Sequence, residues 1–258
     1  MTPNLVTAKL KLKSCLIASF LVFAASLDPV MAAADKNTCV APESFARFKN
    51  PLPALKRTVA SGKNLHIVAL GSSSTAGTGA SSANNRYPRQ LAKTLRKKLS
   101  EIKIRVDNYG RGGTLASHML KRIKKKIISQ TPTLVIWQTG VNDAIRKVPF
   151  DKFEKTIRDG IALLHSRSID VVLLDPQHFP GEKKYADYHK YIALMGTVAK
   201  EMQVPVLRRY DLMKHLVTSA QFKARDLLAK DQFHLNDVSY ACLGKVLGTA
   251  LANSANAQ

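Results

Sequence analysis

Five short apolar runs, each followed by a helical pattern, most strongly limit how this chain can fold. The runs predict strands at residues 65–70, 102–106, 133–138, 171–174 and 204–207. Helices are predicted between and after them, at residues 87–99, 115–129, 150–166, 185–202, 212–217 and 238–252. Strands that alternate with helices form a parallel sheet with helices on both faces. We therefore expect one three-layer α/β/α domain over residues 64–258.

In an open parallel sheet, ligands bind at the carboxyl ends of the strands. One such end carries Ser73 just after the first strand, where its hydroxyl is a candidate nucleophile. The paired glycines Gly112 and Gly113 follow the second strand and allow a backbone N–H to approach a ligand, although glycine pairs also occur in ordinary tight turns. Asn142 follows the third strand and offers an amide donor, or a helix cap.

Two of the seven histidines follow an aspartate by three residues, and either could supply a catalytic base. These pairs are Asp175 with His178 and Asp231 with His234. Their spacing alone does not distinguish them. Neither pair has an evident third ligand, so no metal is expected. Gln177 and His178 form a possible substrate loop, because polar and aromatic residues suited to sugar surround them.

The serine- and glycine-rich loop at residues 71–79 could instead bind a phosphate group. It lacks the G-x-x-x-x-G-K-[ST] pattern and does not fit G-x-G-x-x-G cleanly. A phosphate-binding loop is therefore the weaker interpretation.

Four sequence blocks in a fixed order together resemble the SGNH (GDSL) hydrolase family. They are Gly71-Ser-Ser-Ser-Thr-Ala-Gly77, Asn108-Tyr-Gly-Arg-Gly-Gly-Thr114, Gly140-Val-Asn-Asp143 and Asp231-Gln-Phe-His-Leu-Asn236. The resemblance implies a flavodoxin-like sandwich with five parallel strands and no cofactor. It implies Ser73 as nucleophile, His234 as base and Asp231 as the group that orients the base. The N–H of Ser73, the N–H of Gly113 and the side chain of Asn142 would form the oxyanion hole.

The first block departs from the family pattern at one position. The family usually has Gly-Asp-Ser there, and Ser72 stands in place of the aspartate. That aspartate is not the acid of the catalytic triad, so the departure removes a supporting carboxylate and leaves the triad complete.

The beginning of the chain has the pattern of a secretory signal. Three lysines precede a 13-residue apolar run, and Ala32-Ala-Ala34 follows it, which predicts a signal peptide over residues 1–34. A spanning helix needs about 20 apolar residues, so an uncleaved anchor is disfavoured and the protein is not expected to be integral to a membrane. Residues 35–63 are expected to form an N-terminal arm that covers the domain. The predicted location is the periplasm or the exterior.

The chain carries 40 lysines and arginines against 18 acidic residues, a formal charge of +22. Removal of the signal would leave +20. Export makes nucleic acid an unsuitable partner, so the charge favours an acylated, anionic carbohydrate or lipid substrate, although a merely solvated basic surface fits as well. Self-repulsion favours a monomer. Two cysteines, Cys39 and Cys242, would survive cleavage; they could pair in an oxidising compartment or stay as thiols.

Together these features predict an exported serine esterase that removes short acyl groups, in the first place O-acetyl groups, from an envelope or extracellular polysaccharide. A lysophospholipase or thioesterase acting on longer acyl chains is the alternative enzyme. A catalytically inactive family member that binds polysaccharide is the alternative from a different class.

Overall fold

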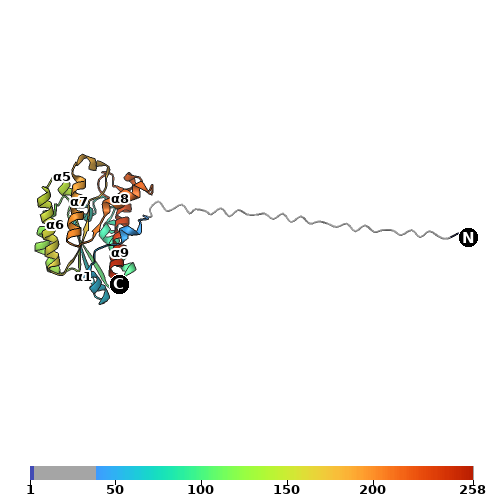
Figure 1. Cartoon of the computed structure of the whole chain (residues 1–258), viewed down its shortest axis with the longest axis horizontal. Helices are drawn as coiled ribbons and strands as arrows, with labels where there is room; N and C mark the ends of the chain where they lie inside the picture. Colours follow the sequence, from blue (N-terminus) through green and yellow to red (C-terminus); the bar gives the residue numbers. More distant parts are fainter. Residues whose placement is uncertain (3–38, 258) are drawn as a thin grey trace. The chain divides into compact units, whose positions relative to one another are not determined.

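The computed structural model describes residues 1–2 and 39–257, which include a parallel sheet of five strands in the order β2-β1-β3-β4-β5 (Figure 1). Buried apolar side chains fill the three inner strands, as expected for a sheet covered on both faces. Every neighbouring pair is parallel, and Leu70 lies opposite both Tyr109 of β2 and Trp137 of β3. The strands are β1 (Leu65–Gly71), β2 (Ile104–Gly110), β3 (Leu134–Gln138), β4 (Asp170–Leu174) and β5 (Val206–Leu207).

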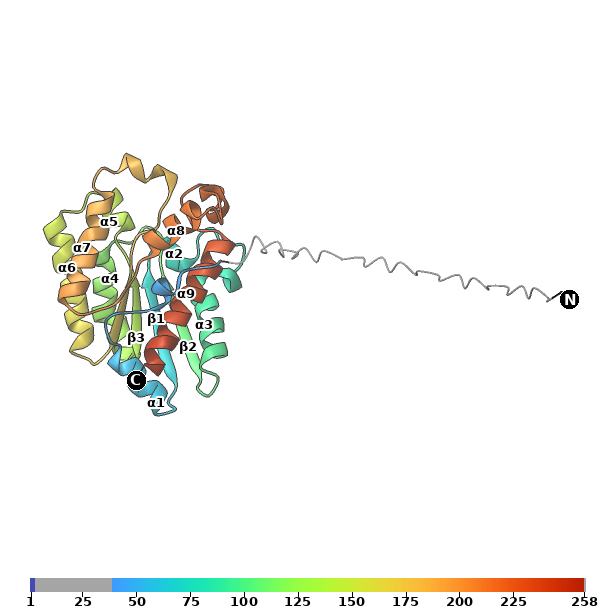
Figure 2. The ribbon, with the colours of Figure 1, turned by 45° about the vertical axis from the view of Figure 1, so that its right-hand side comes forward.

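Helices cover both faces of the sheet, which confirms the predicted three-layer α/β/α fold. Figure 2 shows α3 and α9 on one side of the sheet and α4, α6 and α7 on the other. The longer helices are α3 (Tyr87–Lys98), α4 (Ala116–Arg122), α6 (Phe150–His165), α7 (Tyr188–Glu201), α8 (Arg209–Thr218) and α9 (Asp237–Asn256). With right-handed crossovers, this order brings the ends of β1, β2 and β3 together at one edge of the domain.

Several element boundaries differ from the predicted ones. Strand β2 begins at Ile104 rather than at residue 102 and continues to Gly110, because it pairs with β1 along its whole length. The helix predicted at 115–129 is interrupted: α4 passes into a π-helical turn at Ile123–Ile127 and then a 3-10 turn at Ile128–Gln130. The helix predicted from residue 185 begins at Tyr188, after a 3-10 turn at Pro180–Lys184.

The segment before β1 is more regular than a simple arm. Residues 39–63 contain a 3-10 turn (Glu43–Ala46) and helix α1 (Pro53–Ala60), whose Leu55 is fully buried. The carboxylate of Asp170 accepts the backbone N–H of Leu55 at 2.8 Å, which fixes α1 beneath the start of β4. The signal peptide predicted at residues 1–34 lies, apart from its first two residues, outside the part that the structure describes.

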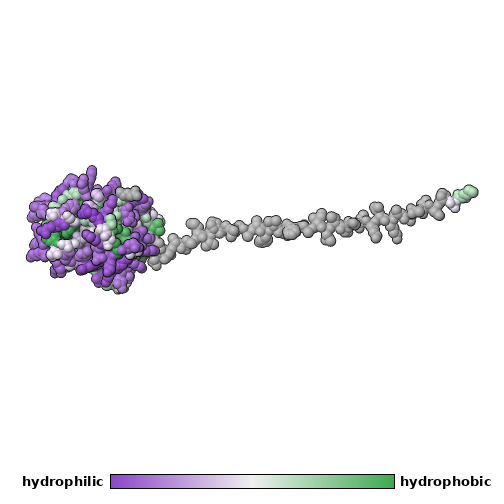
Figure 3. All heavy atoms as spheres, turned by 90° about the horizontal axis from the view of Figure 1, so that it is seen from below, coloured by the Kyte–Doolittle hydropathy of each residue, from purple (hydrophilic) through white to green (hydrophobic). Residues whose placement is uncertain are grey.

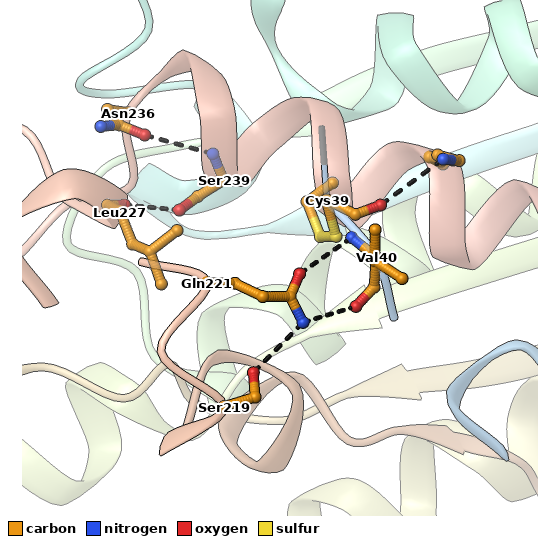
Figure 4. Close-up of a disulfide and its surroundings, with 9 residues drawn as sticks. Cys39, Val40, Ser219, Gln221, Leu227, Asn236 and Ser239 are labelled. Carbon is orange, nitrogen blue, oxygen red and sulfur yellow. Dashed lines mark hydrogen bonds between the residues drawn. A yellow bond between two sulfur atoms is a disulfide. The ribbon is translucent and has the colours of Figure 1, made fainter. Parts of the chain in front are cut away.

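A disulfide joins this N-terminal segment to the last helix. Cys39 and Cys242 of α9 are bonded, with their Cα atoms 5.4 Å apart, well within the usual span. Figure 4 shows that Gln221 lies beside this bond and holds the next residue, Val40, by its backbone N–H and its carbonyl. The segment is therefore tied to α9 covalently and to the 219–221 turn by hydrogen bonds.

The surface of the folded unit is mainly polar. The face drawn in Figure 3 is largely hydrophilic with small hydrophobic patches. Among the described residues, none of the helices combines the length and the apolar character that crossing a membrane requires.

Candidate active site

Ser73 lies at the start of a four-residue helix, α2 (Ser73–Ala76), directly after β1. Gly71 makes this turn possible, because a Cβ there would stand 2.1 Å from the hydroxyl of Thr75. Gly77 ends the helix in the left-handed conformation with φ +90°. The hydroxyl of Ser73 is 2.9 Å from Nε2 of His234.

The neighbouring serines are directed differently. Ser72 is buried, and its N–H and hydroxyl both donate to Oε1 of Gln138, at 2.9 and 3.0 Å. Ser74 is buried as well. Of these three consecutive hydroxyls, the one at Ser73 is therefore the one paired with a histidine.

Gln138, at the end of β3, supports the loop that carries Ser73. It does so although the first block lacks the family's usual aspartate. Its Oε1 also accepts the hydroxyl of Thr75 at 3.1 Å. One neutral carbonyl thus holds three donors from the loop that carries Ser73. The sequence offered a signal for this role, because a lone polar residue ends an otherwise apolar buried strand, Leu134-Val-Ile-Trp-Gln138.

His234 and Asp231 lie in the turn before α9. Oδ2 of Asp231 is 2.5 Å from Nδ1 of His234, and its Oδ1 accepts the backbone N–H groups of Phe233 and His234 at 3.0 and 2.9 Å. Partial burial opposes ionisation, but these hydrogen bonds prevail and lower the pKa of Asp231. An ionised Asp231 fixes the ring so that Nε2 faces Ser73.

Asn236 fixes the start of α9 behind this turn. Its side chain accepts the N–H of Ser239 at 3.1 Å and donates to the carbonyl of Asp226 at 2.8 Å. The position of His234 is therefore set by a capped, buried helix rather than by a free loop.

Gly113 and Asn142 lie on the loops after β2 and β3. Gly113 has φ +70°, a conformation that favours glycine. Asn142 belongs to the short helix α5 (Val141–Ile145), and its amide donates to the carbonyl of Thr114 at 2.9 Å. One amide hydrogen is used in this bond, so the second can serve a ligand. The bond also ties the two loops to each other.

Asp143, next to Asn142, acts as an anchor for α4. It is buried, and both of its carboxylate oxygens face the backbone N–H of Ala116, at 3.1 and 3.3 Å. Burial raises the pKa of Asp143, and hydrogen bonds to Ala116 and other backbone N–H groups oppose this. Its contact fixes the chain just after Gly113. Asp143 belongs to the block Gly140-Val-Asn-Asp143, but the sequence alone did not indicate this contact.

The second Asp–His pair is arranged differently from the first. His178 contacts Oε2 of Glu182 at 3.1 Å, and the buried Asp175 accepts the N–H of Tyr210. Gln177 is 1% exposed, and its amide donates to the carbonyl of Phe233 at 3.4 Å. Gln177 therefore braces the turn that carries His234, and of the two residues of the predicted substrate loop only His178 is partly exposed.

The described residues contain no cluster of three or more side chains that could hold a metal ion. Around Ser73, the structure joins a serine hydroxyl, an imidazole and a carboxylate by hydrogen bonds. Such a set can perform acyl transfer.

Comparison with known families agrees with this geometry. Residues 38–257 match the Non-GDSL lipase-like family. The chain belongs to this family. The resemblance to SGNH hydrolases is thereby confirmed, and both the family and the fold are those of ester-bond hydrolases. No protein of curated function matches the sequence.

Several solved structures share the fold at low sequence identity. A two-domain esterase (CEX) active on acetylated mannans has a TM-score of 0.70 and 20% identity, over 85% of this chain and 58% of that one. An acetyl xylan esterase, AlAXEase, has a TM-score of 0.60 and 23% identity, over 70% and 96% of the chains. A lipase/acylhydrolase from Enterococcus faecalis has a TM-score of 0.60 and 23% identity, over 73% and 96%. The match thus spans little more than half of the first esterase.

Proposed function

We propose that this chain is an exported serine esterase that removes O-acetyl groups from an envelope or extracellular polysaccharide. The observation that carries the proposal is the continuous hydrogen-bonded relay from Ser73 through His234 to Asp231. In this proposal, the three residues form the catalytic triad.

The first half of the reaction forms an acyl-enzyme. Nε2 of His234 takes the proton of Ser73 as its oxygen attacks the ester carbonyl. Asp231 stabilises the imidazolium through Nδ1. His234 then gives the proton to the sugar oxygen as its bond to the acetyl carbon breaks, so that the sugar leaves with a free hydroxyl and the acetyl group stays on Ser73.

The second half releases the acid. His234 takes a proton from water, the hydroxide attacks the acetyl carbonyl, and the proton returns to Ser73 as acetate leaves. In both halves, the negative oxygen is stabilised by the N–H of Ser73, the N–H of Gly113 and the amide of Asn142. One donor of this kind is typically worth about 10²–10³ in rate.

Three observations support the substrate and location. Structurally similar enzymes are named for acetylated mannan and acetyl xylan. The charge of +22 favours a substrate that carries negative groups and a protein that stays monomeric. The signal-like residues 1–34 and the Cys39–Cys242 disulfide fit an oxidising compartment, the periplasm or the exterior.

The test is hydrolysis of p-nitrophenyl acetate and p-nitrophenyl octanoate by the mature chain. We expect acetate to be the better substrate and Ser73→Ala to abolish turnover. The matched control is Ser61→Ala, which removes an exposed hydroxyl near the opposite end of β1. Preference for octanoate would favour the longer-chain alternative. A folded wild type without turnover of either ester would favour the inactive polysaccharide-binding alternative.

A further inference from the structure

The chain that builds one side of the proposed oxyanion hole is strongly basic. Residues 108–130 contain six basic residues and no aspartate or glutamate. They form the end of β2, the Gly112-Gly113 loop, α4 and the π-helical turn after it. The six are Arg111, Lys121, Arg122, Lys124, Lys125 and Lys126.

Two arginines lie on the loops that carry the proposed oxyanion donors. Arg111 is in the same turn as Gly113, because its carbonyl accepts the hydroxyl of Thr114 at 2.8 Å. Arg146 ends α5 one turn after Asn142, and its Nη2 is 3.4 Å from the point where a Cβ on Gly113 would stand. Both side chains are exposed. The two proposed oxyanion donors, Gly113 and Asn142, therefore each have an arginine close by.

The basic surface continues from Arg111 along the end of β2. The positive charge of Arg111 acts on Arg122, whose pKa is lowered by burial first and by this charge second. Arg122 donates to the carbonyl of Tyr109 at 2.8 Å and stands 5.6 Å from the centre of its ring. Lys126 lies 5.2 Å from the same ring. Both cations thus lie over the ring of Tyr109.

These cations lack the acidic partners that some other surface cations have. Among the described residues, Arg111, Arg146 and Lys126 form no ion pair, whereas Arg105 pairs with Asp107 and Lys155 pairs with Asp159. Neighbouring like charges without counter-charges destabilise a folded surface. An anionic ligand would relieve this repulsion, and an arginine can bind a carboxylate through two parallel hydrogen bonds.

We propose that Arg146 and Arg111 bind a carboxylate next to the acetylated position of a polyuronate chain, which continues along Arg122, Tyr109 and Lys126. These five residues form a basic track. This inference rests on the proposed esterase activity for its catalytic readout, and it adds the acidic sugar and the residues that recognise it.

The ring of Tyr109 is important to this choice of ligand. The ring holds the cations of Arg122 and Lys126 close to each other by cation–π contacts, so that the carboxylate of a sugar can meet both of them. An anionic lipid surface would bind the same cations, but it would not place a carboxylate at a fixed distance from the ester. The two ligands therefore make different predictions.

The test compares two polymers of similar length, an O-acetylated polyuronate and an O-acetylated neutral mannan. For the wild type, we expect a lower KM on the polyuronate, with the advantage lost at high salt. Arg146→Gln and Lys126→Gln should each raise KM for the polyuronate about two- to fivefold relative to the mannan, the range for one exposed charge contact. The effect should fall on KM rather than kcat.

The control is Lys63→Gln, which removes the same charge from an exposed site before the amino end of β1. It should leave the ratio of the KM values for the two polymers as in the wild type. Equal ratios in Lys63→Gln and Arg146→Gln, or a ratio that salt does not change, would overturn the proposal.

Failure of the esterase can be separated from failure of the basic track. If p-nitrophenyl acetate is not hydrolysed, the proposed function fails. The basic track can then be tested by binding to immobilised deacetylated polyuronate. Binding of Ser73→Ala that is weakened by adding Arg146→Gln, but not by adding Lys63→Gln, would still support the basic track. Binding to phosphatidylglycerol vesicles without binding to the polyuronate would overturn it in favour of a lipid surface.

Discussion

Gly110 is the position where the end of β2 touches the helix that carries Ser73. A Cβ on Gly110 would stand 2.0 Å from the backbone nitrogen of Ala76 and 2.4 Å from the carbonyl carbon of Thr75. Both contacts are with backbone of α2, so no flexible side chain can move aside. Asn108 holds the same junction by donating to the carbonyl of Thr75 at 2.8 Å.

The substitution Gly110→Ala therefore has to separate β2 from α2. Reaching ordinary contact requires an opening of about 1.4 Å, and overpacking of this kind typically costs about 1–3 kcal/mol of stability. A displacement of about 1 Å at a catalytic group can lower the rate about 10²-fold. We expect kcat/KM on p-nitrophenyl acetate to fall by about that factor, at a temperature where circular dichroism shows the variant folded.

Gly112→Ala is the matched control, because a Cβ there meets nothing within 4 Å. It should unfold in urea at nearly the wild-type midpoint and keep its activity. If Gly110→Ala behaves like Gly112→Ala in both assays, the reasoning from this close approach is wrong.

Three further predictions concern the site and the stability of the chain. Asn142→Ala should lower kcat on p-nitrophenyl acetate by about 10²–10³; a change confined to KM would contradict its role as an oxyanion donor. Burial raises the pKa of Asp175 to about 7, so the folded chain keeps a proton that the unfolded chain loses above about pH 4, and stability falls as pH rises between these values. Asp175→Asn should flatten that fall in urea unfolding, and an unchanged slope would argue against it. Replacing Cys39 and Cys242 by serine should lower the free energy of unfolding by up to about 5 kcal/mol, from the 203-residue separation; an unchanged denaturation midpoint would refute this.

The sheet and the chemical loops could be predicted because both depend on local patterns. Apolar runs such as 65–70 and 133–138 mark buried strands, and in a parallel sheet their carboxyl ends must share an edge. This was enough to expect Ser73, Gly113 and Asn142 near one another, whereas the choice of His234 over His178 came from the family resemblance. The structure brings Ser73, Asp231 and His234 within hydrogen-bond distance, while their catalytic roles stay predictions.

The parts that could not be predicted depend on contacts between distant residues or on very short elements. The contact between Gln138 and Ser72 joins residues 66 positions apart, and although the polar residue at the end of an apolar strand marks Gln138, it does not identify Ser72 as the partner. Helix α2 has four residues, too few to show a helical period. The buried Ile123 and Ile127 have the i, i+4 spacing of a regular α-helix, so the sequence pattern does not indicate the π-helical turn that they bound.

The disulfide has a consequence for the order in which the protein matures. Cys39 leaves the ribosome early, but its partner Cys242 is made some 200 residues later, and eight residues after His234. The thiol of Cys39 must therefore wait, reduced or in a temporary bond, until nearly the whole chain is available. In the proposed exported protein, the bond can close only after Cys242 has reached the oxidising compartment. A chain that ends before His234 would lack both the disulfide and the proposed base, so we expect such unfinished molecules to be inactive.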